Sequence, residues 1–480
     1  MEARNRLPPA RRGLYARRDI LQLGALGVCG LSLPGFLKAR VAAAAPARPR
    51  RGTARSCIIL FQQGGPAQHD TFDMKPGAPA EIRGEFRPIA TSLPGYHICE
   101  HMPLLARQVH RLAIVRAVNH DDPQHNNAGY AVLTGTKPAL LPNTVESLAG
   151  PRPDNHPPFG AVVSRLQPGP MPWVALPYPV VNGIPYPGQT AGFLGARHEP
   201  LWLRPDPKTG AQFTFNELEL PADFSPLRLR GREQLFRALE QPNRAGPAAD
   251  MNAFQSRALD LLTSAATRRA LRLEQEDARL RDRYGRNVFG QSCLLARRLV
   301  EAGVALVNVY SVGFDGFPGR LPLSWDTHWD NFKFLKDGIL PIQDRGYAML
   351  LEDLAQRGLL DETLVVWFGE FGRSPQINER GGREHWPAVY PVVLAGGGVR
   401  GSTLFGASDR NGAYPTADPV TPQDIAATIY HCLGIDPEMA VYDQGRRPIP
   451  IAHGGRPLSD ILTGGSIPSL VSRGRAQHYD

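Results

Sequence analysis

Polar side chains able to bind a metal gather at five places in this 480-residue sequence, each next to an apolar run. Asp70 and Asp73 lie three residues apart in a loop opened by Gly64-Gly65, and hard cations prefer such carboxylate ligands. His125 stands at the start of a helical pattern, where free N–H groups favour an anion and an imidazole could bind a metal. An acid in a turn is more often a local cap, so each pattern alone also has a structural interpretation.

Three further clusters come later in the chain. Asp326 and His328 form an Asp-x-His pair behind an apolar run, and His385 stands just before another run. Glu370 and Arg373 directly follow a third run, within a segment whose glycines let the backbone approach a ligand. The guanidinium of Arg373 could bind a phosphate or sulfate through two N–H groups. The candidate metal ligands are therefore Asp70, Asp73, Asp326, His328, Glu370 and His385.

The apolar runs beside these clusters have the length and composition of strands buried on both faces. Helical patterns separate the later runs, at 251–284, 288–302, 330–356 and 422–433. This alternation predicts an α/β fold with an open, mostly parallel sheet and helices on both faces. Ligands bind at the carboxyl ends of such strands, so we expect the clusters to converge there. The predicted strands are 56–61, 112–115, 304–309, 363–368 and 391–394.

Residues 46–480 are expected to form one enlarged α/β domain. Within it, residues 151–225 are dense in Pro and Gly and show little helical period, which predicts a long irregular insertion. A segment of this kind either covers an active cleft or decorates the surface.

The N-terminus has the features of an export signal. Residues 1–18 hold six arginines against one acid, and Arg17-Arg18 precede an uncharged apolar run from Leu23 to Leu37. That run is shorter and richer in Gly than a membrane span of about 20 apolar residues. We therefore expect a twin-arginine signal peptide over residues 1–45, cleaved near Ala45, with periplasmic or secreted localisation and no stable membrane span afterwards. An uncleaved anchor is the other interpretation.

Composition argues against a nucleic-acid partner. The formal net charge is +9, but residues 1–45 hold eight basic and two acidic side chains, which leaves about +3 for the mature part. Its basic residues are scattered and form no basic face with aromatic platforms. The four cysteines that remain after cleavage lack Cys-x-x-Cys spacing, which predicts buried thiols, although one disulfide in an oxidising compartment stays open.

Along nearly all of the mature chain the sequence resembles the bacterial family catalogued as domain of unknown function 1501. That family in turn resembles the alkaline phosphatase and sulfatase superfamily, whose members place a metal-bound nucleophile beside an open parallel sheet. The phrases that carry the resemblance are Gln63-Gly64-Gly65-Pro66, Asp70-Thr71-Phe72-Asp73, Arg83-Gly84-Glu85-Phe86, Ile98-Cys99-Glu100-His101, Leu133-Thr134-Gly135, Trp325-Asp326-Thr327-His328, Gly369-Glu370-Phe371-Gly372-Arg373 and His385-Trp386-Pro387.

The superfamily resemblance implies roles for individual residues. Its nucleophile stands ten residues before the Gly of a Leu-Thr-Gly ending, and that position is His125 here. The order of its metal ligands resembles Asp326, His328, Glu370 and His385. This chain departs from the pattern where Phe371 replaces a His ligand, and where His125 and Asn127 supply neither a hydroxyl nor a thiol.

Two functions follow from these residues. The first is an exported, sulfatase-like hydrolase of phosphate or sulfate esters that depends on a divalent metal, with Arg373 holding the anion and His125 as nucleophile or acid–base group. The second is a non-catalytic relative that binds a sulfated glycan or a secreted protein. The partner in the first case is an anionic small molecule or a sulfated or phosphorylated glycan. Mixed carboxylate and imidazole ligands suit Zn, Mn, Ca or Mg.

Overall fold

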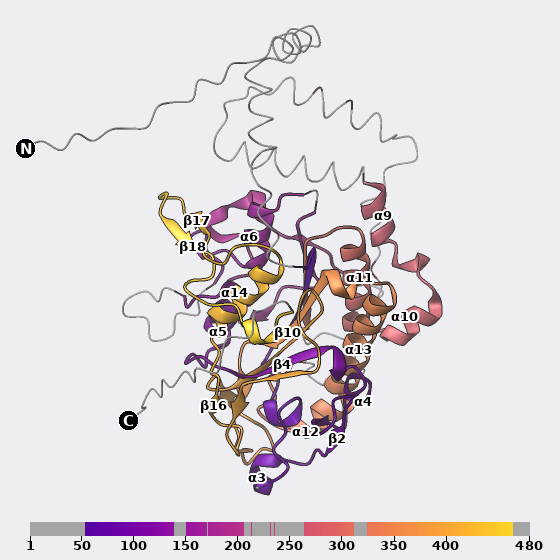
Figure 1. Cartoon of the computed structure of the whole chain (residues 1–480), viewed down its shortest axis with the longest axis vertical. Coiled ribbons are helices and arrows are strands. Elements are labelled where there is room, and N and C mark those ends of the chain that lie inside the picture. Colours follow the sequence, from indigo (N-terminus) through magenta and orange to yellow (C-terminus); the bar gives the residue numbers. More distant parts are fainter. Residues whose placement is uncertain are drawn as a thin grey trace, which may run out of the picture. The chain divides into compact units, whose positions relative to one another are not determined.

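The computed structural model describes residues 53–138, 150–205 apart from Pro170, 264–311 and 324–463, with three isolated residues between 213 and 235. The expected signal peptide 1–45, the end of the insertion near residue 225 and the helical pattern before residue 264 lie outside this part, apart from those isolated residues. The described residues belong to one compact unit that begins at Arg51 (Figure 1).

An eight-stranded sheet forms the centre of the described chain, in the order β14-β4-β13-β10-β1-β9-β5-β8. Its neighbours are parallel except where β13 pairs with β10 and with β4, so the expected mostly parallel sheet is confirmed. Strand β13 runs backwards because no helix crosses over between it and β10, and a parallel return needs such a crossover. The strands are β1 (Ser56–Gln62), β4 (Leu112–Val118), β5 (Trp173–Leu176), β8 (Leu201–Trp202), β9 (Leu306–Ser311), β10 (Thr363–Gly369), β13 (Tyr390–Ala395) and β14 (Thr403–Phe405).

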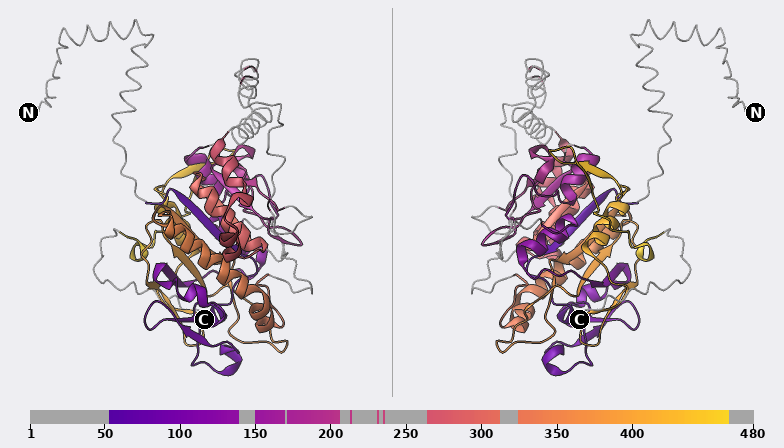
Figure 2. Two further views of the ribbon diagram at one scale, coloured as in Figure 1. Left: turned by 90° about the vertical axis from the view of Figure 1, so that its right-hand side faces the viewer. Right: turned by 90° about the vertical axis from the view of Figure 1, so that its left-hand side faces the viewer.

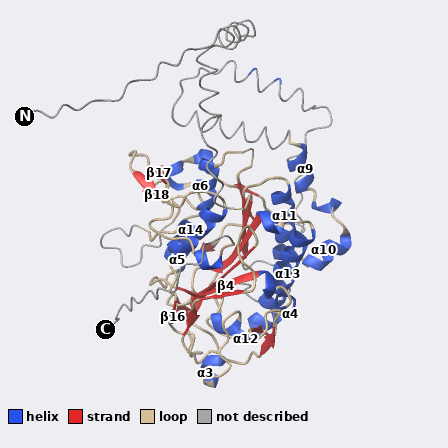
Figure 3. Ribbon diagram, in the orientation of Figure 1, coloured by secondary structure: helices blue, strands red, loops and turns tan. Residues whose placement is uncertain are grey.

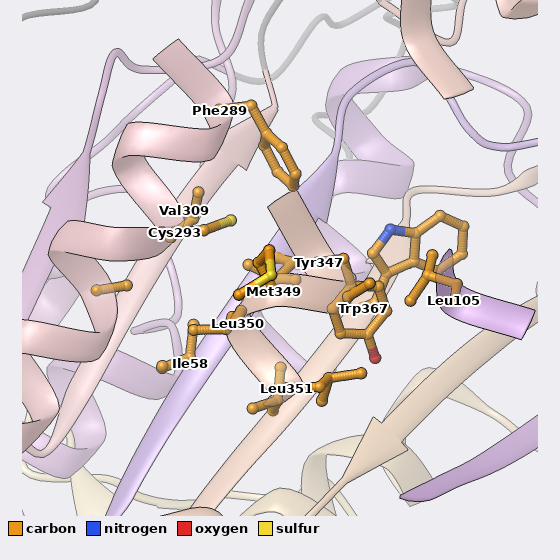
Figure 4. Close-up of a cluster of buried hydrophobic side chains, with 14 of the residues drawn as sticks. Ile58, Leu105, Phe289, Cys293, Val309, Tyr347, Met349, Leu350, Leu351 and Trp367 are labelled. Atoms are coloured by element: carbon orange, nitrogen blue, oxygen red, sulfur yellow. The ribbon is translucent and has the colours of Figure 1, made fainter. Parts of the chain in front are cut away.

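Helices cover both faces of this sheet, as expected (Figure 3). Side chains of a strand alternate between faces, so Ile58 and Leu60 of β1 enter one core and Ile59 and Phe61 enter the other. Figure 4 shows the first core, where Ile58 and Trp367 lie among side chains of α11 and α13. The second core lies under α5, α6 and α14. The central strands are thereby held rigidly, as a site at their ends requires.

The helices agree with the predicted periods where these are described. The pattern 330–356 is α12, a π-helical stretch Leu335–Ile339 and α13 in succession. The expected lack of helix after residue 151 is wrong at α6, whose apolar face packs on the buried strand β5. The helices are α3 (Ala80–Arg83), α4 (Pro103–Ala106), α5 (His125–Thr134), α6 (Phe159–Leu166), α9 (Ala265–Leu271), α10 (Ala278–Tyr284), α11 (Val288–Glu301), α12 (Asn331–Phe334), α13 (Leu340–Gln356) and α14 (Pro422–Cys432).

Small two-stranded ribbons extend from the central layers (Figure 2). Cys57, Cys99, Cys293 and Cys432 are free and buried, as the sequence predicts. Among the described residues, no helix combines the length and apolarity that crossing a membrane requires. The ribbons are β2 (Pro88–Ala90) with β3 (His97–Cys99), β6 (Val181–Asn182) with β7 (Ile184–Pro185), β11 (Gly372–Arg373) with β12 (His385–Trp386), β15 (Ala407–Ser408) with β16 (Pro415–Ala417), and β17 (Ala440–Tyr442) with β18 (Pro448–Pro450).

Register brings three strand ends to one edge. The last residue of β1, Gln62, pairs with Gly369 of β10 on one side and with Ser311 of β9 on the other. The loops that follow β1 and β10 therefore leave the sheet side by side, next to the end of β9.

Candidate metal centre

His125 is the first residue of α5, and its imidazole is almost fully buried. The ring packs against two other rings, with centroid distances of 4.3 Å to His385 and 5.0 Å to Phe371. Its Nδ1 lies 2.6 Å from Oε1 of Glu370. A carboxylate from a central strand end therefore fixes the orientation of this imidazole.

Glu370 directly follows β10 and is completely buried. Besides His125, its Oε1 accepts hydrogen bonds from the backbone N–H of Gly64 at 2.8 Å and from the hydroxyl of Tyr186 at 3.1 Å. Oε2 has no hydrogen-bond partner among the described residues. Three contacts from three separate segments thus hold one oxygen of this carboxylate in place.

Gly64 allows the loop after β1 to lie against the loop that carries Asp326. Its φ is +102°, and a Cβ built there would lie 2.3 Å from the backbone nitrogen of Asp326. Trp325 fixes the same approach, because its backbone N–H donates to Gln63 O at 2.9 Å and its indole donates to Gln62 Oε1 at 3.0 Å. Only glycine fits this backbone contact, which sets the position of the Asp326 carboxylate.

The Asp326 carboxylate is the common contact of three imidazoles. Its Oδ2 lies 3.2 Å from Nε2 of His125, a distance typical of an ion pair but without the alignment of a hydrogen bond. Its Oδ1 lies 2.9 Å from Nε2 of His328 and 3.1 Å from Nε2 of His385. These three rings come from α5, from the loop before α12 and from β12.

The cluster can hold one cation. Among the described residues, donor atoms of His125, Asp326 and His385 lie within 4.8 Å of one another, and imidazole nitrogen with carboxylate oxygen is a common donor set for protein-bound metals. The side chains of Asp326 and His385 are 34% and 21% exposed, so solvent reaches the cluster from one side. His125 and Glu370 close the other side.

The charges of the cluster are strongly coupled. Burial lowers the pKa of His125, but its contacts with Asp326 and Glu370 outweigh burial and raise that pKa to about 9. Hydrogen bonding to Asp326 raises the pKa of His328, whereas burial lowers the pKa of His385. The pKa of Asp326 is lowered despite burial, because three imidazoles and Arg373 surround it. The raised pKa of His125 and the guanidinium of Arg373 thus place positive charge beside the Asp326 carboxylate.

Asp70 and Asp73 lie outside this cluster, unlike the sequence-based expectation. Asp70 is fully buried and accepts from the guanidinium of Arg383 through both oxygens, at 2.9 Å and 3.1 Å. Asp73 pairs with Lys75 at 3.0 Å and bonds to the hydroxyl of Ser408. Arg383 and Lys75 already neutralise these two carboxylates. Asp70 and Asp73 therefore stabilise the fold around the site.

Arg373 also differs from its expected role. Its side chain is completely buried, and it donates to Oδ1 of Asp326 at 2.6 Å, to the backbone oxygens of Gly64 and Gly65, and to that of Arg383. These acceptors, with a 3.5 Å contact from Nη1 to His328 Nε2, account for its five N–H groups. Arg373 therefore orients Asp326 and has no donor left for an incoming anion.

Two residues of the site carried no clear sequence signal. Tyr186 belongs to the Pro/Gly-rich insertion, yet its ring is buried against Gly129 of α5 and its hydroxyl reaches Glu370. Glu384 contacts His328, with 2.5 Å between Oε2 and Nδ1. Glu384 directly precedes β12 and His385 is its first residue, and the two side chains contact opposite nitrogens of the His328 ring, Nδ1 and Nε2.

Comparison with known proteins gives a family but no function. The family model DUF1501, described as a protein of unknown function, matches residues 54–462. No curated protein matches the sequence.

Solved structures similar to the chain include sulfatases and a phosphonate monoester hydrolase. A phosphonate monoester hydrolase from Silicibacter pomeroyi is 15% identical, with 87% of this chain and 78% of that chain covered and a TM-score of 0.35. A 2-O GAG sulfatase is 12% identical, with 86% and 75% covered and a TM-score of 0.37. The periplasmic domain of EcEptC from Escherichia coli, in complex with Zn, is 10% identical, with 86% and 96% covered and a TM-score of 0.34. Likenesses with TM-scores below 0.5 assign no function to this chain.

Proposed function

Given that this chain belongs to the DUF1501 family, we propose that it is a metal-dependent hydrolase of phosphate or sulfate esters. The observation that carries the proposal is the group of donor atoms from His125, Asp326 and His385 within 4.8 Å of one another. These residues come from three segments far apart in sequence, and each is fixed by a further contact. A fold rarely assembles such a group only for packing, because unpaired buried polar groups cost stability.

The residues present fit a divalent cation. When bound, such an ion supplies Lewis-acid polarisation of an ester oxygen. Glu370 holds the His125 ring, Arg373 holds the Asp326 carboxylate, and the partly exposed rings of His328 and His385 face solvent. A substrate ester therefore approaches from the His328 side, and the attacking group in this proposal is water from that side.

Export remains part of the proposal. The paired Arg17-Arg18 before an uncharged apolar run supports passage through the twin-arginine route to the periplasm or beyond. N-terminal sequencing of the protein from the periplasmic fraction tests it. A protein that still starts at Met1 there contradicts cleavage near Ala45.

The test of hydrolysis combines metal analysis with a substrate screen. Protein purified without chelator should contain a divalent metal, and a panel of aryl sulfates, phosphate monoesters and phosphate diesters should reveal turnover. Asp326→Ala should lose both metal and turnover, because the common contact of three imidazoles is gone. Asp337→Ala, on an exposed site of the helical segment after Asp326, is the matched control and should lose neither. Metal-loaded parent protein without turnover on any ester contradicts the proposal.

The engagement of Arg373 within the protein favours a second function, which is binding without catalysis. An enzyme that handles sulfate or phosphate needs cationic donors for the anion, and here the buried guanidinium is fully engaged within the protein. In that case the protein would bind a sulfated glycan or a secreted partner through side chains other than Arg373. His125→Ala would then change affinity for the anionic partner, measured by calorimetry, and the parent would show no turnover.

A further inference from the structure

Residues 180–189 of the Pro/Gly-rich insertion form a small arm that is braced from within. Strands β6 and β7 pair at its tip, and the buried side chain of Gln189 closes its base. Oε1 of Gln189 accepts the backbone N–H of Val180 at 2.7 Å, and Nε2 donates to the backbone oxygens of Val180 and Tyr186 at 2.9 Å and 3.1 Å. The backbone N–H of Tyr186 also donates to Val180 O at 3.0 Å. These bonds define the shape of the arm independently of the rest of the chain.

The arm is attached where the loop after β1 leaves the sheet. Nε2 of Gln63 donates to the backbone oxygen of Val181 at 3.0 Å. Gln63 directly precedes Gly64, whose backbone N–H donates to Oε1 of Glu370 at 2.8 Å. Residues 181–185 at the tip are exposed, so burial of the tip does not explain why the arm is held at this place.

Tyr186 extends from the arm into the protein, and its side chain is completely buried. The ring lies against Gly129 of α5, and a Cβ on that glycine would clash with the ring. Glycine inside a helix costs stability relative to alanine, so the room that it leaves for Tyr186 is a specific feature of α5. The hydroxyl of Tyr186 then reaches Oε1 of Glu370 at 3.1 Å.

The two oxygens of the Glu370 carboxylate have different surroundings. Oε1 faces three donors, from Gly64, His125 and Tyr186, whereas Oε2 has no hydrogen-bond partner among the described residues. The last torsion of a glutamate side chain has broad preferences, so contacts have to decide how the carboxylate is rotated. Here the donors on Oε1 decide it, and they turn that oxygen toward His125.

We propose that Tyr186 is a positioning residue, which fixes the rotation of the Glu370 carboxylate and through it the His125 imidazole, and that the arm 180–189 serves to deliver its hydroxyl. The consequence for a bound metal rests on the proposed function, whereas the positioning itself requires neither metal nor ester. This role for the insertion differs from the cover or the surface decoration that its composition suggests.

One substitution separates positioning from packing. If Tyr186 only packs the arm against α5, its hydroxyl has no effect on His125. Tyr186→Phe keeps the ring against Gly129 and removes the hydroxyl alone. Tyr310→Phe is the matched control, because Tyr310 of β9 is also buried and its hydroxyl has no hydrogen-bond partner among the described residues.

The first measurement uses metal-free, full-length protein without substrate. In proton NMR at pH 7, the Nδ1–H of His125 should give a resonance downfield of the amide region, which His125→Gln removes. Tyr186→Phe should move this resonance further downfield, because Oε1 of Glu370 then has two donors in place of three and attracts each remaining proton more strongly. Tyr310→Phe should leave it in place. An unchanged resonance in Tyr186→Phe overturns the proposal, as does a parent without such a resonance, since Glu370 would then not hold the imidazole.

The second measurement is Zn²⁺ titration by calorimetry, since mixed imidazole and carboxylate ligands suit zinc. Loss of a group that orients a metal ligand usually lowers affinity by about tenfold to 100-fold, and Tyr186 acts one contact further out. We therefore expect Tyr186→Phe to lose about tenfold in zinc affinity, at the lower end of that range, and Tyr310→Phe to bind zinc like the parent. Gln189→Ala removes the bonds that close the arm and should reproduce part of both effects, with circular dichroism to check that it folds.

The outcomes separate this proposal from the proposed function. A shifted resonance in Tyr186→Phe, in a parent that binds no zinc and turns over no ester, keeps the positioning role and removes the hydrolase. An unchanged resonance and zinc affinity in Tyr186→Phe, in a parent that hydrolyses esters, overturns the positioning role alone.

Discussion

Arg383 and Asp70 form a fully buried, two-bond ion pair, with Nε to Oδ2 at 2.9 Å and Nη2 to Oδ1 at 3.1 Å. The same guanidinium donates to the backbone oxygens of Ser374, Pro375 and Ile82. The pair therefore ties the segment between β11 and β12 to the loop after β1, and His385 stands two residues beyond Arg383. Asp70 therefore supports the candidate metal centre without contacting its residues.

Asp70→Asn should destabilise the protein severely. Removing one partner of a buried ion pair leaves the other charge uncompensated, which typically costs about 3–5 kcal/mol. Urea unfolding monitored by fluorescence measures the loss. Glu438→Gln, at an exposed position, is the control and should stay within about 0.5 kcal/mol of the parent. A parent-like stability for Asp70→Asn would mean that the pair contributes little.

Gly64→Ala should lower both stability and metal affinity. The added Cβ would lie 2.3 Å from the backbone nitrogen of Asp326 and would hold a non-glycine residue at φ +102°. Backbone strain of this kind costs about 1–3 kcal/mol, and the clash displaces Asp326 as well. Gly77→Ala is the matched control, because a Cβ there meets nothing within 4 Å. If calorimetry finds equal zinc affinity in the two variants, the contact does not position Asp326.

Glu370→Gln should weaken metal binding while the fold persists. Glutamine keeps the size of the side chain and one acceptor oxygen, but its neutral amide no longer favours a proton on Nδ1 of His125. Loss of such a partner usually lowers metal affinity by about tenfold to 100-fold. Zinc titration measures the change, and Glu362→Gln serves as the control, because Glu362 stands at the other end of β10 and pairs with Arg55 at the surface. Unchanged affinity would separate Glu370 from the metal.

Zinc affinity should rise with pH up to about 9. A ligand nitrogen has to lose its proton before it binds, and the pKa of His125 in the metal-free protein is raised to about 9 by Asp326 and Glu370 against the effect of burial. Below that pH, binding releases the proton of His125, so affinity increases as pH rises from 7 and then levels off. Calorimetry in buffers of different ionisation enthalpy counts the protons released. No release between pH 7 and 8 would show that His125 does not bind the metal.

Asp344 should make stability fall as pH rises. Burial raises its pKa from 3.8 to about 6, although it accepts the backbone N–H groups of Leu104 and Leu105. A raised folded-state pKa gives a contribution that is complete below the unfolded value of about 4 and is lost as pH rises through about 6. Asp344→Asn cannot ionise, so its stability relative to the parent should increase by up to about 3 kcal/mol between pH 4 and pH 8. Urea unfolding at both pH values checks this, with the exposed Asp337→Asn as the control. A constant difference contradicts the prediction.

The central strands could be predicted because a strand buried on both faces reads as an unbroken apolar run, as in 56–61 and 363–368. Strand direction could not be predicted for β13, because an apolar run looks the same whichever way it is traversed. Their positions beside strand ends predict that Asp70, His125, Asp326, Glu370 and His385 meet. The structure brings the last four together, whereas Asp70 pairs with Arg383 outside the cluster.

The roles of the charged residues were harder to predict. A sequence displays Asp70 and Arg373 as available charges, whereas the folded chain pairs them with Arg383 and Asp326. Partner choice depends on contacts between segments about 300 residues apart, as with Arg373 and Gly65. No local sequence pattern predicts contacts over such a separation. The role of Tyr186 is hidden in the sequence for the same reason, since its partner Glu370 is distant in the chain.

The position of β1 within the sheet also determines the order in which the protein can fold during synthesis. Among the described residues, the first strand to leave the ribosome is β1, which lies between β9 and β10, and its Ser56 has Thr363 as partner. Pairing over such a separation is slow, since the entropy of closing the long loop must be overcome before any contact forms. A chain handed to a membrane translocase before Gly369 has been synthesised would lack the middle of its sheet and Glu370, which holds the His125 ring of the candidate metal centre.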